Sequence, residues 1–251
     1  MHKKFVIIDH KKVGITTSGT KGQTLILLPG WTHDFQYETK FVQELAKKHK
    51  VVTISYPGYF ESQENYKSMS MLFLAEIVDS VIKQLKLKDF KLIGFSMGCQ
   101  VVLKYIDIFN KTAKAVLISP TLNPLTDYLN PAQIKLVKAR FILKLVRISN
   151  YLKPRLVNLA YAKIGSVTEG KQKDIYFKSK SVSINGAFDT LVAMATSFVD
   201  PLKYKDNVQF IFGDKEILQD KLKGVIEYKV LKNTGHGAFD THYKEIAELI
   251  N

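Results

Sequence analysis

The sequence predicts an α/β fold in which a mostly parallel sheet is covered by helices on both faces. Short apolar runs alternate with segments of helical periodicity over residues 1–120, and the alternation resumes over residues 199–251. Apolar runs without polar alternation are typical of strands buried on both faces. Between them, residues 121–198 show helical periodicity and no convincing strand. We therefore expect one core domain, formed by residues 1–120 and 199–251, with a helical lid at residues 121–198.

The first half of the chain supplies most of the expected sheet. Apolar runs predict strands at Lys4–Asp9, Val13–Thr17, Thr24–Leu28, Val51–Ser55, Phe90–Ile93 and Ala115–Ser119. A polar turn joins the first two strands, which we expect to pair. Apolar residues at helical spacing predict helices at Phe35–Lys48, Met69–Leu85 and Cys99–Phe109. Because crossovers between parallel strands are right-handed, this strand–helix order places helices on the faces of a parallel sheet.

The pattern changes after the strand that ends at Ser119. Helical periodicity within the lid occurs at Ala132–Ser149, Pro154–Lys163, Lys171–Ser179 and Phe188–Phe198. Strands return at Val208–Phe212 and Glu227–Leu231, and a last helix spans Tyr243–Ile250. Ligands of open α/β sheets bind outside the carboxyl ends of the strands, so we expect the lid to cover that edge.

Cysteine usage and the N-terminal residues indicate where the protein works. Cys99 is the single cysteine, which excludes an internal disulfide and favours a reducing compartment. We interpret it as a small buried residue. The N-terminal apolar run ends after four residues at Asp9, which is too short for a signal peptide. No stretch is long enough for a membrane-spanning helix, so the sequence predicts a cytoplasmic protein.

The net charge of +14 comes almost entirely from lysine. Only three of the 37 basic residues are arginine: Arg140, Arg147 and Arg155. Proteins that recognise nucleic acids favour arginine for bidentate contacts with phosphates and bases. We therefore interpret the charge as solvated surface, expect no nucleic-acid partner, and leave attraction of an anionic substrate or carrier open.

The most informative motif is Gly94-Phe95-Ser96-Met97-Gly98, which lies between an expected strand and an expected helix. A G-x-S-x-G sequence in this context is a nucleophile elbow, in which a sharp turn exposes the serine hydroxyl. A β-carbon at either glycine would strike the adjacent strand or helix, and the Met97 N–H is left to bind an oxyanion. The alternative is an ordinary turn whose serine caps the helix.

Four further motifs occur where acyl transfer would need them. They are Leu27-Leu28-Pro29-Gly30-Trp31, the segment from Ser55 to Ser62, the segment Phe210-Ile211-Phe212-Gly213-Asp214-Lys215-Glu216, and Asn233-Thr234-Gly235-His236-Gly237-Ala238-Phe239. With these motifs the chain resembles the α/β-hydrolase fold family of serine hydrolases, of the carboxylesterase or lipase kind, over essentially its whole length.

The resemblance assigns the oxyanion hole to two backbone N–H groups. One is that of Met97, and the other is that of Trp31, which follows the Pro29-Gly30 turn. Proline replaces the histidine that the family usually has at residue 29, which matters little because the donors are backbone groups. Ser55 and Phe60 replace the aspartate and a glycine of a second family turn, whose role is structural.

Three residues are candidates for the acid of a catalytic triad. The family places it three residues beyond the strand-ending glycine, which is Glu216 here. Asp214 is the competitor and is nearer to the strand end, and Asp200 is a weaker third candidate. We favour Glu216, because a carboxylate at the later position in the loop can reach the second nitrogen of the histidine.

His236 is the candidate base. It follows the last expected strand between two glycines, and the chain order Ser96, acid, His236 is the order of this fold. The other histidines have no triad position, although His33 is close enough to the oxyanion turn to line the pocket. No His/Cys cluster has the spacing of metal ligands and no glycine-rich phosphate loop occurs, so we expect neither metal nor cofactor.

The implied function is a serine hydrolase that cleaves carboxylic esters or thioesters through an acyl-enzyme. Alternatives on the same fold are a C–C bond hydrolase, an aminopeptidase and a non-catalytic ligand-binding protein. Serine at the elbow argues against dehalogenases and epoxide hydrolases, which use aspartate there.

The expected lid is more basic than the rest of the chain. Residues 121–190 contain twelve Lys and Arg against four Asp and Glu, so they carry +8 of the net +14. Ala132–Ser149 is either a lid helix with its apolar stripe over an acyl pocket, which we favour, or a basic helix that meets an anionic membrane surface or an acidic acyl carrier. We expect the lid to attract an anionic ester or its carrier.

Overall fold

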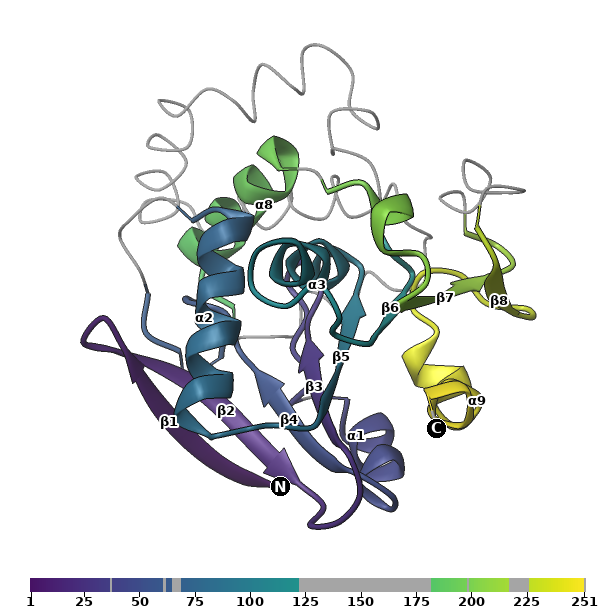
Figure 1. Cartoon of the computed structure of the whole chain (residues 1–251), viewed down its shortest axis with the longest axis horizontal. Helices are drawn as coiled ribbons and strands as arrows, with labels where there is room; N and C mark the ends of the chain where they lie inside the picture. The colour runs from purple at the N-terminus through teal and green to yellow at the C-terminus, as the bar shows by residue number, and fades with distance from the viewer. Residues whose placement is uncertain are drawn as a thin grey trace.

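The computed structural model of the protein describes residues 1–36, 38–60, 62–64, 69–121, 182–197, 199–216 and 226–250. Within these residues one eight-stranded sheet has the strand order β1-β2-β4-β3-β5-β6-β7-β8 (Figure 1). The strands are β1 (His2–Ile8), β2 (Lys11–Ser18), β3 (Thr24–Leu28), β4 (Lys50–Ile54), β5 (Phe90–Phe95), β6 (Ala115–Ile118), β7 (Val208–Gly213) and β8 (Tyr228–Leu231). Strand β2 is antiparallel to both β1 and β4. The remaining neighbours are parallel, so the sheet is mostly parallel as the sequence predicts.

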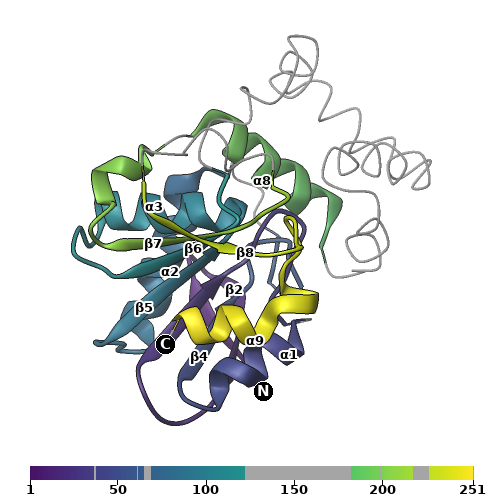
Figure 2. The same ribbon diagram turned by 90° about the vertical axis from the view of Figure 1, so that its right-hand side faces the viewer.

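Helices cover both faces of this sheet. They are α1 (Thr39–Ala46), α2 (Met71–Gln84), α3 (Met97–Ile108), α8 (Ile184–Thr196) and α9 (Phe239–Ile250), with a short 3₁₀ turn, η2, at Pro201–Tyr204. Helices α2 and α3 pack together on one face, and α1 and α9 pack together on the other (Figure 2). Each face therefore has its own apolar core.

Strand β3 shows why both faces need cover. Leu25 and Leu27 belong to the cluster that contains α1 and α9, whereas Ile26 and Leu28 belong to the cluster that contains α2 and α3. Successive side chains of a strand point to opposite faces, so an apolar strand buries half of its residues on each side. All four leucine and isoleucine side chains are fully buried.

Most predicted elements are confirmed, with boundaries moved by a few residues. The first helix is the clearest error, because α1 begins at Thr39 and not at Phe35. Phe35 is buried, but the Asp34 carboxylate accepts a hydrogen bond from the Gln36 N–H (2.9 Å), and His33 N–H bonds to Gly30 O (3.3 Å). These local bonds replace the helical bonds of an earlier start.

Of residues 121–198, where the sequence predicts a lid, the structure describes residues 121 and 182–197. Helix α8 replaces the predicted Phe188–Phe198 helix and begins earlier, where Ser183 caps it by accepting a hydrogen bond from Gly186 N–H. The predicted helices at Ala132–Ser149, Pro154–Lys163 and Lys171–Ser179 lie outside the described residues. No described helix is both long and apolar enough to cross a membrane.

Strands β3, β5, β6, β7 and β8 are parallel, so their carboxyl ends meet at one edge of the sheet. Helix α8 lies beyond this edge in both views (Figures 1 and 2). The loops that leave these strands carry the candidate residues named above.

Candidate active site

Ser96 lies on the turn between β5 and α3, in a backbone conformation that is uncommon for a residue with a side chain. Its φ is +49° and its ψ is −115°. Its N–H donates to Ile118 O of β6 (2.9 Å), and its carbonyl accepts from Cys99 N–H (3.0 Å). A strained residue persists only where its surroundings fix it, and such residues cluster at functional sites. The conformation of Ser96 is therefore that expected of a nucleophile elbow.

The two glycines of this motif are required by close backbone contacts. A β-carbon at Gly98 would lie 2.1 Å from Leu28 O, and one at Gly94 would lie 2.8 Å from the Cα of Cys99. Gly98 lets the start of α3 pack on the end of β3, and Gly94 lets β5 pack on α3. These close contacts confirm the expectation that a β-carbon at either glycine would strike a neighbouring strand or helix.

His236 lies on the loop between β8 and α9 and contacts Ser96 directly. Its Nε2 is 2.9 Å from Ser96 Oγ. The imidazole also packs on the ring of Phe95, with ring centroids 5.2 Å apart. A neutral imidazole that accepts a proton at Nε2 carries its own hydrogen on Nδ1. His236 can therefore accept the Ser96 proton only if Nδ1–H faces an acceptor or water.

Glu216 follows β7, and its carboxylate is the acidic group that lies near His236 Nδ1. Its Oε2 is 3.8 Å from His236 Nδ1. Its Oε1 accepts hydrogen bonds from the Ser119 hydroxyl and from Gly213 N–H (3.3 Å). Both Glu216 Oε2 and His236 Nδ1 are buried and have no hydrogen-bond partner among the residues that the structure describes. A hydrogen bond between them would need an approach of about 1 Å and would satisfy both atoms.

Asp214 lies on the same loop but contacts a different part of the site. Its carboxylate accepts hydrogen bonds from Asn233 N–H (2.8 Å) and Thr234 N–H (3.0 Å). The bond from Asn233 is the main reason why the pKa of Asp214 is held below its usual value. Asp214 thus ties the loop after β7 to the loop that carries His236. The third candidate, Asp200, accepts Leu202 N–H (3.0 Å) and caps η2.

The two predicted oxyanion donors lie at the ends of neighbouring strands. Met97 is the first residue of α3, so its N–H has no acceptor within the helix. Trp31 follows β3, and its indole N–H donates to Ala187 O of α8 (2.8 Å). The next residue, Thr32, donates its N–H to the Tyr59 hydroxyl (3.1 Å), which also bonds to Thr190 of α8 (2.9 Å). Helix α8 therefore holds the loop that carries Trp31.

A buried polar cluster beneath this loop was not anticipated from the sequence. Ser55 donates to the Asp34 carboxylate (2.7 Å) and accepts from the Gln36 amide (2.8 Å). Burial raises the pKa of Asp34. Asp34 supplies a carboxylate beside residue 55, where the family turn has its own aspartate and this chain has serine. His33 bonds through Nε2 to Glu38 (3.1 Å) and packs on Phe35 and Phe95.

A contact of Ser119 with Glu216 is also not predicted from the sequence. Ser119 follows β6, between Ser96 and Glu216 in the order of the sheet, and its only signal was its place at the end of a predicted strand. Cys99 is buried as expected, and burial raises the pKa of its thiol. Among the described residues, no three His, Cys, Asp or Glu side chains group as metal ligands would.

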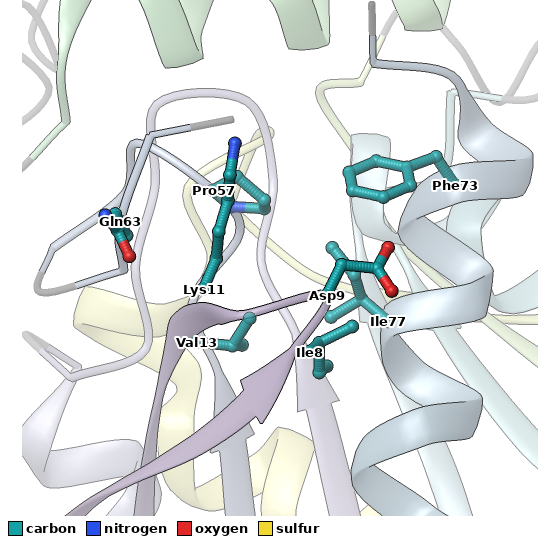
Figure 3. Close-up of a pocket in the computed structure, with 8 residues that line it drawn as sticks. All are labelled: Ile8, Asp9, Lys11, Val13, Pro57, Gln63, Phe73 and Ile77. Atoms are coloured by element: carbon teal, nitrogen blue, oxygen red, sulfur yellow. The ribbon is translucent and has the colours of Figure 1, made fainter. Parts of the chain in front are cut away.

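One small pocket lies away from this site, against the first hairpin. Its lining residues are Ile8, Asp9, Lys11, Val13, Pro57, Gln63, Phe73 and Ile77 (Figure 3). Its volume is about 50 Å³, whereas pockets for small molecules usually have roughly 300–1,000 Å³. None of the residues discussed above as triad or oxyanion candidates lines it.

The fold and the family can be compared with known proteins. Among solved structures, a bromoperoxidase from Bacillus anthracis has 20% sequence identity and a TM-score of 0.75, with 99% of this chain and 98% of that chain covered. An esterase from Exiguobacterium antarcticum has 18% identity and a TM-score of 0.71, with the same coverages of 99% and 98%. A thermophilic esterase from Thermogutta terrifontis has 14% identity and a TM-score of 0.78, covering 100% and 97%. At these identities the likeness shows the fold, and a family model for the alpha/beta hydrolase fold matches residues 23–243. The chain therefore belongs to the alpha/beta hydrolase fold family.

Proposed function

We propose that this protein is a serine hydrolase that cleaves carboxylic esters or thioesters, with Ser96 as nucleophile, His236 as base and Glu216 as the acid. The observation that carries the proposal is the 2.9 Å contact between His236 Nε2 and Ser96 Oγ at a strained turn. A nucleophile and a base within hydrogen-bond distance, with a third group behind the base, are the signature of nucleophilic catalysis.

In the first half of the reaction, Ser96 Oγ attacks the acyl carbonyl carbon while its proton passes to His236 Nε2. The carbonyl oxygen becomes an oxyanion, to which the N–H groups of Met97 and Trp31 donate hydrogen bonds. The bond to the leaving alcohol or thiol then breaks, and the leaving group takes the proton from His236. The acyl group remains on Ser96 as an ester.

In the second half, water replaces the leaving group. His236 accepts a proton from the water as its oxygen attacks the acyl-enzyme. Collapse of the second tetrahedral intermediate returns the proton to Ser96 and releases the carboxylic acid. Glu216 fixes the tautomer with hydrogen on Nδ1 and stabilises the imidazolium, for which its Oε2 lies 3.8 Å from that nitrogen.

Esters and thioesters are the substrates that this arrangement suits best, because alkoxide and thiolate are expelled from a tetrahedral intermediate more readily than the nitrogen of an amide. Two of the structurally similar proteins are esterases, which supports the same substrate class. The proposed chemistry uses side chains and backbone N–H groups of the protein together with water.

A fluorophosphonate probe tests the proposal. It phosphonylates a serine that a base activates, so the wild type is expected to label, whereas Ser96→Ala and His236→Ala are expected to lose labelling. The same two variants should also lose hydrolysis of p-nitrophenyl esters, which are tested at increasing chain length. Failure of the wild type to label would refute the proposal.

Matched variants control for the substitutions themselves. Ser80→Ala changes a partly buried serine of α2, and His242→Ala changes a histidine of α9 whose Nδ1 hydrogen-bonds with the Thr241 hydroxyl (2.7 Å). Both variants should label like the wild type. If His242→Ala and His236→Ala lost labelling to the same degree, the assigned base would be wrong.

A further inference from the structure

Ser119 occupies the strand end that lies between the candidate nucleophile and the candidate acid. Strand β6 is flanked by β5 and β7, and these strands lead to Ser96 and Glu216 respectively. Ser119 N–H donates to Ile211 O of β7 (2.8 Å), and the preceding carbonyl, that of Ile118, accepts from Ser96 N–H (2.9 Å). The end of β6 is therefore bonded to both neighbouring strand ends.

The backbone of Ser119 is held in an unusual conformation and its side chain is buried. Its φ is +49°, and the residue is 1% exposed. Serine rarely adopts positive φ, and such a conformation persists only where the surroundings fix it. The conformation accompanies a hydrogen bond from the hydroxyl to Glu216 Oε1, across 97 residues of sequence.

That bond divides the two oxygens of Glu216. Oε1 accepts from Ser119 and from Gly213 N–H, whereas Oε2 is buried, has no hydrogen-bond partner among the described residues and lies 3.8 Å from His236 Nδ1. A carboxylate held at one oxygen cannot rotate freely about its terminal bond. The hydrogen bond from Ser119 thus leaves Oε2 directed toward the histidine.

We propose that Ser119 is a positioning residue for Glu216, which orients this carboxylate toward His236. The inference rests on the proposed function, because it assigns a role to Ser119 through the acid of that site. Glu216 is 5% exposed, and a buried carboxylate needs hydrogen-bond donors or a cation to satisfy its oxygens. The described groups around it are the donors of Ser119 and Gly213, the imidazole of His236 and the neutral thiol of Cys99.

Ser119→Gly is the variant that tests this role most cleanly. Glycine adopts positive φ without strain, so the substitution removes the hydroxyl and keeps the backbone conformation. We expect kcat for a p-nitrophenyl ester to fall by about 10-fold to 100-fold, because a misplaced acid no longer orients the base, with KM changed less than about twofold.

The pH profile distinguishes positioning from a merely structural role. The hydroxyl holds the carboxylate in its contact with the imidazole, so its removal weakens the interaction that stabilises the imidazolium. The acidic limb of the kcat/KM profile should therefore move to lower pH. A variant that was only partly folded would lower the whole profile without moving this limb.

Two further variants complete the experiment. Lys86→Gly places glycine at a different positive-φ residue (φ +52°), which is exposed and lies before the start of β5, whereas Ser96 follows its end; it should leave both kcat and the pH profile unchanged. In the Glu216→Gln background, Ser119→Gly should cause little further loss, because the two residues act through one contact.

The outcomes separate this inference from the proposed function. If the wild type labels and turns over but Ser119→Gly keeps wild-type kcat and an unmoved acidic limb, only the role of Ser119 is refuted. Fully additive losses in the double variant would also refute it. If the wild type neither labels nor hydrolyses any ester, both the function and the role of Ser119 are overturned.

Discussion

Asp214 and Glu216 are separated by a single residue, yet their side chains have different partners. Glu216 is buried beside His236 and Ser119, whereas the Asp214 carboxylate accepts two backbone N–H groups from the loop that carries His236. We infer that Glu216 acts on the imidazole and Asp214 on the loop. The two contributions can be separated by amide substitutions, which keep the shape of each side chain.

Glu216→Gln should lower kcat by about 100-fold or more, because an amide can neither stabilise the imidazolium nor enforce the required tautomer. Asp214→Asn should keep kcat within about threefold of the wild type. Steady-state kinetics with one p-nitrophenyl ester measures both. If Asp214→Asn alone abolished turnover, Asp214 would be the acid.

Asp214→Asn should instead reduce stability in a pH-dependent way. The folded protein holds the pKa of Asp214 below 3.8, so the ionised carboxylate stabilises the folded state above the pKa of the unfolded chain. The stability that it contributes is lost as pH falls through the folded pKa. Thermal melts should show a lower Tm for the variant at pH 7 and a difference that narrows below about pH 5. A pH-independent difference would exclude this origin.

The sequence predicts the residues of the proposed site, but it does not predict which of their side chains contact one another. Ser96, His236 and the two carboxylates stand out because each follows an apolar strand with glycine close by. The choice between Asp214 and Glu216 depends on the path of a loop, and a one-residue difference in a loop reverses which side chain faces inward. Ser119 could not be found, because its role depends on a strand order that no local pattern encodes.

At the scale of the elements, the approach of α3 to β3 sets the position of Ser96. A β-carbon at Gly98 would meet two backbone oxygens, at 2.1 Å from Leu28 O and 2.7 Å from Pro29 O. Neither can move without shifting the strand end and the Pro29-Gly30 turn. A β-carbon at Gly30 would meet side-chain atoms at 3.0 Å or more, those of Phe95 and Ser96.

Gly98→Ala should therefore destabilise the protein by about 1–3 kcal/mol, as overpacking of a close contact does. Gly30→Ala should cost less stability but lower kcat, because the Ser96 β-carbon has to give way. The two variants are compared by their Tm in calorimetry and by their kcat with one ester. If Gly98→Ala melted with the wild type, the packing of α3 on β3 would be looser than the structure shows.

The predicted elements agree with the structure where burial of apolar residues determines it. They differ from it where local polar hydrogen bonds determine it. The predicted strand Thr24–Leu28 has the observed bounds because its four apolar residues in a row, Leu25 to Leu28, have to be buried on both faces. The predicted start of α1 is too early in the chain, because the Asp34 carboxylate accepts a hydrogen bond from Gln36 N–H. The regular part of α9 begins after a kink at His242, which is where the sequence predicted the helix to start.

At the scale of the whole molecule, the excess of positive charge is the property most open to experiment. The net charge is +14, and residues 121–190 carry +8 of it. A positive field raises the local concentration of anions near the molecule and speeds their association. Its reach shrinks from about 30 Å at 0.01 M ionic strength to about 8 Å at 0.15 M. Salt dependence therefore measures whether the charge serves the reaction.

We expect kcat/KM for an anionic ester, or for an ester on an acidic acyl carrier, to fall several-fold between about 0.01 M and 0.15 M salt, and that of a neutral ester of equal length to stay constant. Changing Lys135, Lys138 and Lys144 to glutamate should abolish the difference. The control changes the exposed Lys88, Lys111 and Lys205 to glutamate, which alters the net charge equally outside residues 121–190. An equal salt response for both esters would refute attraction of anions. An equal effect of the two triple variants would assign the attraction to the whole molecule and not to residues 121–190.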